Sequence, residues 1–221
     1  MNSAGVKAYK GVGMEGIIAK WYAANTRKGL EEYKALARQV AAELAPGSEV
    51  LELAPGPGYF AIELARLGSY RIAGLDISQT FVEMARKNAR EARVEVDFRQ
   101  GNAAATPFDN ETFEFILCRA AFKNFAEPLK AVQEMHRLLR RGGKALIIDL
   151  RRDAPQESIN QAVDSMGLNW VNRLITKLTF RFMLLKRAYT RSEFEQLFSQ
   201  TNFQRVDIQK TLMGLEMWLE K

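Results

Sequence analysis

The segment from Val50 to Phe60, VLELAPGPGYF, constrains the fold more than any other part of the chain. It begins with apolar residues expected of a short buried strand, with Glu52 near the end of that strand. Gly56 and Gly58 then allow a sharp turn, because glycine adopts backbone conformations that other residues avoid. Apolar residues at helical spacing follow at once. A strand, a glycine turn and a helix in this order are typical of the nucleotide-binding start of a doubly wound sheet.

Helix-like and strand-like patterns alternate on both sides of this segment. Helices are expected at 14–24 and 30–44 before it, and at 79–92 and 127–140 after it. Further strands are expected at 71–76, 94–98, 113–118 and 144–150. Ser78 is the expected N-cap of the helix at 79–92, and the glycines at 142–143 are expected to end the helix at 127–140. Alternation with short connections predicts a parallel sheet with ligands at the carboxyl ends of its strands.

The alternation breaks after residue 150, where two successive helices are expected at 155–166 and 169–186. It resumes with Thr190 as an N-cap, a helix at 191–199 and strands near 204–210 and 212–220. The predicted fold is therefore α/β, with a Rossmann-like, seven-stranded, mostly parallel sheet and an antiparallel C-terminal strand. We divide it into an N-terminal helical cap at 1–45 and a sheet domain at 46–221, with a helical insertion at about 153–188.

Composition excludes several classes of protein. Hydrophobic residues make up 47% and charged residues 26%, which is ordinary for a soluble chain that buries a core. An uninterrupted apolar run of about 18 residues is absent, so no transmembrane helix is expected. The first 20 residues lack the apolar core of a secretion signal, and the single cysteine fits a reducing compartment, so we expect a cytoplasmic protein.

Few residues are of the types that build metal centres or hydrolytic triads. His136 is the one histidine, so neither a multi-histidine metal site nor a Ser–His–Asp triad is expected. The net charge of +6 and pI near 9.5 favour anionic partners only where basic residues cluster, and here they are dispersed. We therefore expect neither a bound metal nor a nucleic-acid partner.

Three polar positions follow successive predicted strands and together describe a binding pocket. Glu52 can bind an ammonium group beside the glycine turn. Asp76, 18 residues past Gly58, is placed to accept hydrogen bonds from ribose hydroxyls. Asn102, after the third strand, can accept from an exocyclic amine such as that of adenine. The combination suits an adenosine that carries a charged tail.

These motifs resemble those of the class I S-adenosylmethionine-dependent methyltransferases, especially the small-molecule branch related to quinone-biosynthesis enzymes. The resemblance covers residues 46–150. It rests on the segments VLELAPGPG (50–58), GLDIS (74–78), GNA (101–103), TPF (106–108), FEFIL (113–117) and LLRRGGK (138–144).

The resemblance implies S-adenosylmethionine as methyl donor and S-adenosylhomocysteine as product. By the same resemblance, the methionine part would be held by Glu52, Ala54, Gly56 and Gly58. Asp76 with Ile77 would bind ribose, and Asn102 with Ala103 would meet adenine. The loop from Cys118 to Arg119 would close the far side of the cofactor. Alanine stands at 54 where the family often has glycine, and asparagine at 102 where it often has aspartate.

The methyl acceptor is expected to be a small, fairly apolar molecule, because the segment at 155–188 is rich in Leu, Met, Phe and Trp. This segment is interpreted first as a lid over the acceptor, second as a helix pair packing on the sheet domain. Its third interpretation is contact with a membrane surface through 169–186. Candidate acceptor contacts are Tyr9, Tyr22, Tyr59, Arg119, Phe122, Asp149 and Tyr189. A catalytic residue is not identified.

Three other functions stay open. An RNA or protein methyltransferase is motivated by the positive charge. A non-catalytic S-adenosylmethionine-binding protein is motivated by Phe122–Asn124, which stands where this branch often has a histidine pair. An NAD(P)-binding oxidoreductase is motivated by the glycine turn alone, although its Pro–Gly–Pro–Gly form fits the G-x-G-x-x-G pattern poorly.

Overall fold

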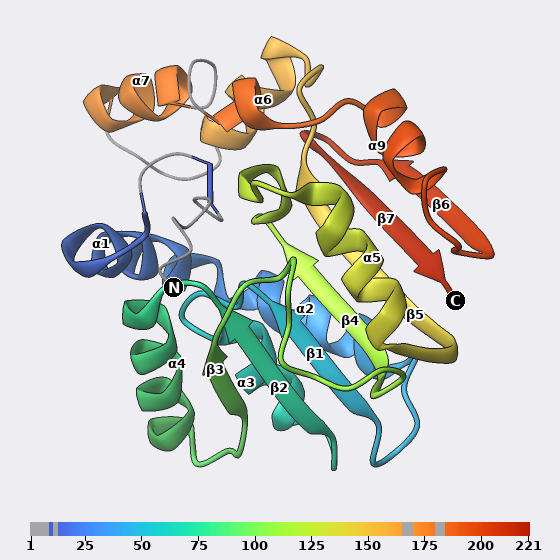
Figure 1. Ribbon diagram of the computed structural model, residues 1–221. Helices are drawn as coiled ribbons and strands as arrows, with labels where there is room; N and C mark the ends of the chain where they lie inside the picture. Colours follow the sequence, from blue (N-terminus) through green and yellow to red (C-terminus); the bar gives the residue numbers. More distant parts are fainter. Residues whose placement is uncertain (1–8, 11–12, 165–169, 180–183) are drawn as a thin grey trace, which may run out of the picture.

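The computed structural model describes residues 9–10, 13–164, 170–179 and 184–221. Within these residues, seven strands form one sheet in the order β3-β2-β1-β4-β5-β7-β6. The strands are β1 (Glu49–Leu53), β2 (Arg71–Asp76), β3 (Asp97–Gln100), β4 (Phe113–Arg119), β5 (Leu139–Leu150), β6 (Arg205–Lys210) and β7 (Gly214–Glu220). The first five are parallel to one another, and β7 lies antiparallel between β5 and β6. The predicted Rossmann-like, mostly parallel sheet is confirmed (Figure 1).

Helices surround the sheet. They are α1 (Gly16–Thr26), α2 (Leu30–Ala41), α3 (Tyr59–Ala65), α4 (Gln79–Ala92), α5 (Pro128–Leu138), α6 (Gln156–Asp164), α7 (Trp170–Thr179), α8 (Leu185–Arg187) and α9 (Arg191–Phe198). The Ser78 hydroxyl caps α4 by accepting from the Phe81 amide at 3.1 Å. Thr190 caps α9 in a reciprocal capping box with Glu193. Both N-caps agree with the sequence prediction.

Each strand side chain contributes to one of two cores because successive residues point to opposite faces of the sheet. Leu51 and Leu53 of β1 pack in the core shared with α5 and α9. Val50 packs in the opposite core, shared with α2, α3 and α4. Figure 1 shows α5 in front of the sheet and α2 and α3 behind it. This alternation directs Glu52 to the α2–α3 face.

The junction between α5 and β5 differs from the prediction. The helix ends at Leu138 and the strand begins at Leu139, so the glycines at 142–143 do not terminate the helix. They form an irregularity inside β5, where the pairing with β4 moves from Phe113↔Leu139 to Phe115↔Lys144. The prediction was wrong here because pairing with β4, together with a 2.8 Å bond from the Gly142 amide to the C-terminal residue, holds the segment extended.

The third strand is displaced along the chain. It was expected at 94–98, but pairing with β2 begins at Ala73↔Asp97 and continues to Gln100. Arg93 ends α4 in a left-handed conformation, and the Val94 amide still bonds back to the Ala89 carbonyl at 3.1 Å. The apolar alternation that suggested the strand therefore comes from side chains that pack beside the helix end.

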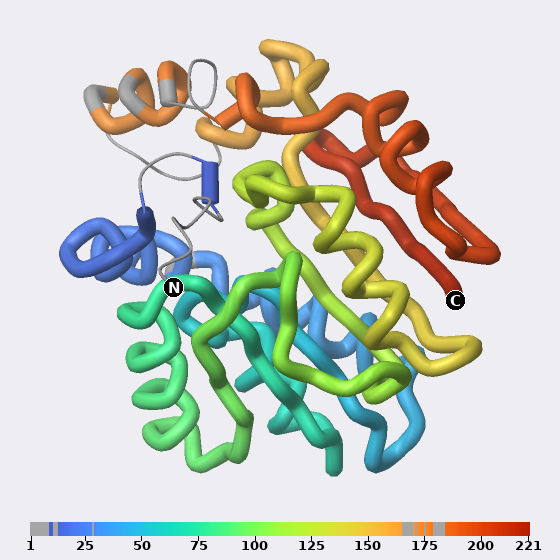
Figure 2. Tube along the Cα trace, viewed as in Figure 1, coloured from blue at the N-terminus to red at the C-terminus, as the bar shows by residue number. Residues whose placement is uncertain are grey.

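The insertion after β5 lies above the carboxyl ends of the parallel strands (Figure 1). The chain leaves β5, passes through α6 and α7, and returns through α8 to α9 (Figure 2). Asp164 of α6 pairs with Lys177 of α7 at 2.9 Å and lies 3.7 Å from Arg173. Residues 165–169 and 180–183 lie outside the described residues. The predicted single helix over 169–186 includes some of them, so its continuity stays a prediction. In the described part of the chain, no helix is long and apolar enough to cross a bilayer.

The N-terminal helices are attached to the sheet domain. The Glu15 carboxylate accepts from the Gln79 and Thr80 amides at 3.1 Å each, where α4 begins. The Ser78 hydroxyl donates to the Met14 carbonyl at 2.6 Å, and α2 packs beside α3 in the same core. Apart from Tyr9 and Lys10, residues 1–12 lie outside the described residues. The division into a cap and a sheet domain stays a prediction.

Candidate cofactor site

The glycine turn after β1 uses left-handed backbone conformations. Ala54, Gly56 and Gly58 have φ values of 56°, 55° and 81°. A Cβ at Gly58 would lie 2.7 Å from the Phe98 ring, so this glycine is required for packing. At Gly56 the nearest atom to such a Cβ is a ring carbon of Tyr22 at 4.0 Å. The turn therefore packs tightly at Gly58 and leaves room for a ligand at Gly56.

Asp76 connects the end of β2 to this turn. One carboxylate oxygen accepts from the Gly56 amide and the other from the Ser78 amide, both at 2.9 Å. The side chain is buried, and burial raises its pKa above the ordinary value despite these bonds. A carboxylate accepts about four hydrogen bonds, so Asp76 keeps capacity for ligand hydroxyl groups.

The Glu52 side chain is buried, and few hydrogen bonds replace the water that its carboxylate loses. Among the described residues, its one hydrogen bond comes from the Ala61 amide at 3.2 Å. Burial raises its pKa to about 8, and the Arg119 guanidinium opposes that rise. A buried carboxylate with spare acceptor capacity is a site for a cationic group.

Three tyrosines surround the turn. Tyr22 of α1 lies beside Gly56 and packs edge-on against Phe81. The Tyr59 hydroxyl donates to the Ala23 carbonyl at 3.1 Å, and its ring packs edge-on against Tyr33 of α2. Tyr22 and Tyr59 were candidates from the sequence. Tyr33 was missed because it belongs to the apolar face of a regular helix, and such a pattern indicates packing alone.

Side chains expected on the adenine side lie at the ends of β2 and β3. Ile77 is 39% exposed immediately after Asp76. The Asn102 carboxamide oxygen accepts from the Ala104 amide at 2.9 Å, so it shapes its own loop. Ala103 is partly buried against the core. The roles of these three residues toward adenine stay predictions.

We call the site formed by Glu52, Gly56 and Asp76 at the ends of β1 and β2 the cradle. Next to the cradle, the carboxyl ends of β4 and β5 hold a buried ion pair. Lys123 Nζ lies 2.8 Å from Asp149 Oδ1, and the two side chains are 5% and 1% exposed. The ammonium also donates to the Ala120 carbonyl at 2.5 Å, and the Lys123 amide donates to Asp149 Oδ2 at 2.8 Å. Asp149 was a candidate from the sequence, whereas Lys123 was missed. A lone lysine inside the apolar run AAFKNF was the available signal.

Two candidates lie in the core. Phe122 and Cys118 have no exposed surface. Phe122 packs among Phe125, Tyr189 and Phe194, and burial raises the pKa of the Cys118 thiol well above its ordinary value. The structure does not bring these two side chains to the surface of the cradle.

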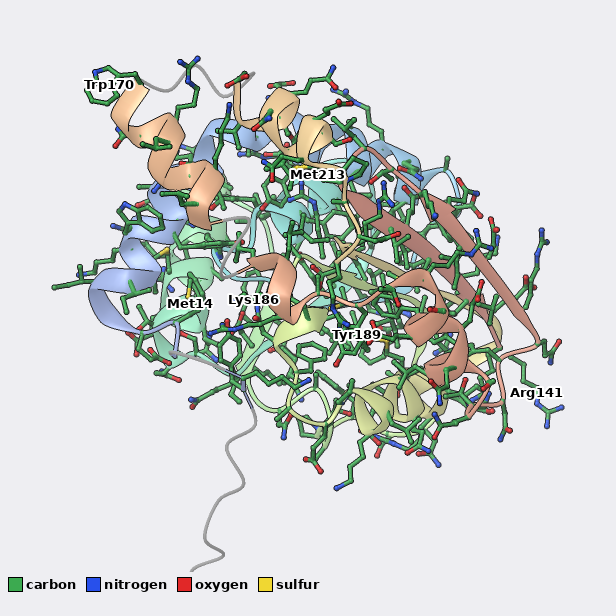
Figure 3. All side chains as sticks on the ribbon, turned by 90° about the horizontal axis from the view of Figure 1, so that it is seen from above. Met14, Arg141, Trp170, Lys186, Tyr189 and Met213 are labelled. Atoms are coloured by element: carbon green, nitrogen blue, oxygen red, sulfur yellow. The ribbon has the colours of Figure 1, made fainter. Side chains whose placement is uncertain are left out.

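The segment at Tyr9 and Lys10 crosses toward the loop after β4. Tyr9 forms a β-bridge with Phe125, and Lys10 donates from its ammonium to the Tyr189 hydroxyl at 3.0 Å. Arg187 donates to the Lys10 carbonyl at 3.3 Å. Seen from above, the labelled Met14, Lys186 and Tyr189 bring the N-terminal segment next to the segment before α9 (Figure 3). These contacts join the segment at Tyr9 to the loop after β4 and to the segment before α9.

Comparison with known proteins identifies the family. The model of a methyltransferase domain matches residues 51–147. The uncharacterized methyltransferase YcgJ of Bacillus subtilis is 31% identical over 183 residues, covering 81% of this chain and 67% of that protein. The chain belongs to the class I S-adenosylmethionine-dependent methyltransferases.

Two further comparisons, one with a curated relative and one with a solved structure, show how far the likeness extends. The demethylmenaquinone methyltransferase of Deinococcus radiodurans is 33% identical over 101 residues, covering 45% of this chain and 42% of the relative. A crystal structure of a proposed S-adenosylmethionine-dependent methyltransferase from Methanococcus maripaludis matches with a TM-score of 0.73 and 18% identity. The match covers 96% of this chain and 95% of the Methanococcus maripaludis chain. The chain thus spans less than half the length of the curated quinone methyltransferase.

The cradle has the donors and acceptors that the methyltransferase cofactor requires. Glu52 has acceptor capacity for an ammonium, Asp76 has capacity for the ribose hydroxyls, and the backbone is open at Gly56. Among the described residues, no group of His, Cys, Asp and Glu side chains has the arrangement of a metal site. S-adenosylmethionine would supply the activated methyl group at this position.

Replacing Glu52 with glutamine is expected to stabilise this methyltransferase increasingly as the pH rises. The unfolded chain releases the Glu52 proton near 4.5 and the folded chain near 8. Ionisation therefore favours unfolding between these values, by roughly 1.4 kcal/mol per pH unit. Urea unfolding measures the free energy of unfolding of both proteins at pH 5.5 and at pH 8. The variant's advantage over the wild type should be about 3 kcal/mol larger at pH 8 than at pH 5.5. An equal gain at both pH values would contradict a raised Glu52 pKa.

Proposed function

We propose that this chain transfers a methyl group from S-adenosylmethionine to a small, fairly apolar acceptor by in-line displacement. The observation that carries the proposal is the cradle at the ends of β1 and β2. There the buried Glu52 carboxylate, the open turn at Gly56 and the Asp76 carboxylate lie side by side. Family membership supports S-adenosylmethionine as the methyl donor. The residues around the cradle support a small, fairly apolar molecule as the methyl acceptor.

The residues around the cradle favour an apolar acceptor. Tyr22 of α1 is partly buried against the turn at Gly56, and Tyr9 lies within electrostatic range of Asp76 and Asp149. Burial raises the pKa of both phenols, so both are protonated at neutral pH. Protonated phenols would donate hydrogen bonds to an acceptor oxygen and would not act as bases. The demethylmenaquinone methyltransferase relative supports a quinone or quinol-like ring as the acceptor class.

Methyl transfer from a sulfonium requires mainly orientation and the exclusion of water, because the leaving thioether needs no acid. Positioning of reactants can supply roughly 7–11 kcal/mol of the barrier reduction. In this chain the cradle holds the donor, and the Lys123–Asp149 pair fixes the loop after β4 beside it. The insertion at α6–α8 and the segment at Tyr9 would enclose the acceptor. Enclosure by the insertion, rather than simple packing, is part of the proposal.

A product panel tests the proposal. The full chain is incubated with methyl-labelled S-adenosylmethionine and a series of quinols, phenols, thiols and amines, and products are detected by mass spectrometry. We expect labelled product from apolar ring acceptors and a higher rate as acceptor hydrophobicity increases. Labelling only of RNA or protein would overturn the acceptor class, and cofactor binding without any product would favour a non-catalytic binding protein.

A further inference from the structure

Arg119 ends β4 directly beside the strand that carries Glu52. The β1–β4 register pairs Glu52 with Leu117 and Leu53 with Cys118, so Arg119 lies one residue beyond, level with the start of the glycine turn. Because side chains alternate along a strand, Arg119 points to the same face of the sheet as Leu117, which is the face of Glu52. A guanidinium and a carboxyl group therefore lie on one face of the sheet, at the ends of adjacent strands.

The Arg119 guanidinium is held in position by α2. Its central carbon lies 4.4 Å from the centre of the Tyr33 ring, a cation–π contact. One nitrogen lies 2.8 Å from Glu32 Oε2, and the Arg119 side chain is 23% exposed. Glu32 itself is 73% exposed, and exposed ion pairs contribute little. A ligand carboxylate could therefore replace Glu32 at little energetic cost.

The lysine that follows β4 is already committed to protein groups. Lys123 is buried and committed to Asp149 and to the Ala120 carbonyl. Arg119 keeps donors to spare, because a guanidinium has five N–H groups and, among the described residues, Arg119 donates one side-chain hydrogen bond, to Glu32. Arginine is also the side chain whose planar donors match a carboxylate with two parallel bonds.

We propose that Arg119 binds the α-carboxylate of the methionine part of the cofactor, with Tyr33 holding the guanidinium in place. The proposal rests on the proposed function, in which Glu52 receives the ammonium of the same amino-acid group. Glu52 and Arg119 would then bind the two charges of a zwitterion, and the site would select against nucleosides that lack the amino-acid carboxylate. The sequence placed Arg119 both in the loop that closes the far side of the cofactor and among the acceptor contacts, and the proposal assigns it to the cofactor.

The test compares two ligands that differ by one carboxylate. Titration calorimetry measures the affinities of S-adenosylmethionine and decarboxylated S-adenosylmethionine for the wild type, Arg119→Gln and Arg119→Lys. We expect the wild type to prefer S-adenosylmethionine by about tenfold to a hundredfold. Arg119→Gln should lose this preference while binding the decarboxylated ligand as the wild type does, and Arg119→Lys should be intermediate.

Two control variants isolate the carboxylate contact. Arg140→Gln removes an exposed arginine paired with Glu114 at the amino ends of β5 and β4, away from the carboxyl ends, and should leave both affinities unchanged. Glu32→Gln releases Arg119 from its partner and should leave S-adenosylmethionine binding unchanged or stronger. An equal change for both ligands in Arg119→Gln, or no change for either, would overturn the inference while leaving the proposed function intact. Failure of the wild type to bind either ligand would overturn both.

Discussion

Replacing Asp76 with alanine is expected to weaken S-adenosylhomocysteine binding by roughly a hundredfold or more. Hydrogen bonds to a charged group contribute about 1.5–3 kcal/mol each, and the ribose of the ligand offers two hydroxyls. The same substitution removes the acceptor of the Gly56 and Ser78 amides, so the glycine turn also loses its attachment to β2. Titration calorimetry at pH 7.5 measures the effect directly.

Asp207→Ala is the matched control for Asp76→Ala. Asp207 lies on β6 at the far edge of the sheet and accepts only an exposed hydrogen bond from Gln209. Its removal should change the affinity by less than twofold and leave the melting temperature almost unaffected. An Asp76→Ala protein that is folded by circular dichroism and binds S-adenosylhomocysteine like the wild type would contradict the assignment of Asp76.

Replacing Lys123 with methionine is expected to lower the free energy of unfolding by about 3–5 kcal/mol. The substitution leaves the Asp149 carboxylate, 1% exposed, without its cation in the interior. Asp149 keeps hydrogen bonds from the Lys123 and Leu150 amides, which do not replace a neutralising charge. Urea unfolding at pH 7 measures the loss, and a rise in stability on acidification would identify the unpaired carboxylate.

Two further variants separate the effect of the buried charge from the loss of side-chain volume. Lys123→Met combined with Asp149→Asn removes both charges and keeps an acceptor for one of the two amides, so it should recover part of the lost stability. Lys144→Met breaks the more exposed pair with Glu43 and should lower stability by no more than about 1 kcal/mol. Equal losses in Lys123→Met and Lys144→Met would show that burial of the pair contributes nothing.

The parts of the fold with strong local signals could be predicted from sequence. The turn at Gly56 and Gly58 needs backbone conformations that few residues adopt, and Ser78 and Thr190 mark helix starts through hydrogen bonds within one turn. Strands buried on both faces appear as apolar runs, which is why the pattern at 71–76 agrees with β2. In each case the information lies within a few neighbouring residues.

The misplaced elements depend on contacts between distant residues. Gly142 lies inside a strand because β4 and the C-terminal residue pair with that segment. The start of β3 is set by its register with β2 and not by its own apolar alternation. The contact of Arg119 with Tyr33 joins β4 to α2, so neither local pattern reveals it. Likewise, Lys123 could be recognised as buried only once β5 had placed Asp149 against it.

The most direct test of the central claim is calorimetric titration of the intact chain with S-adenosylhomocysteine and, separately, with NADH. The cradle of Glu52, Gly56 and Asp76 predicts binding of one S-adenosylhomocysteine per chain and no detectable binding of NADH. Binding of NADH with no heat from S-adenosylhomocysteine would show that the turn after β1 serves a dinucleotide, and would contradict the account of this site.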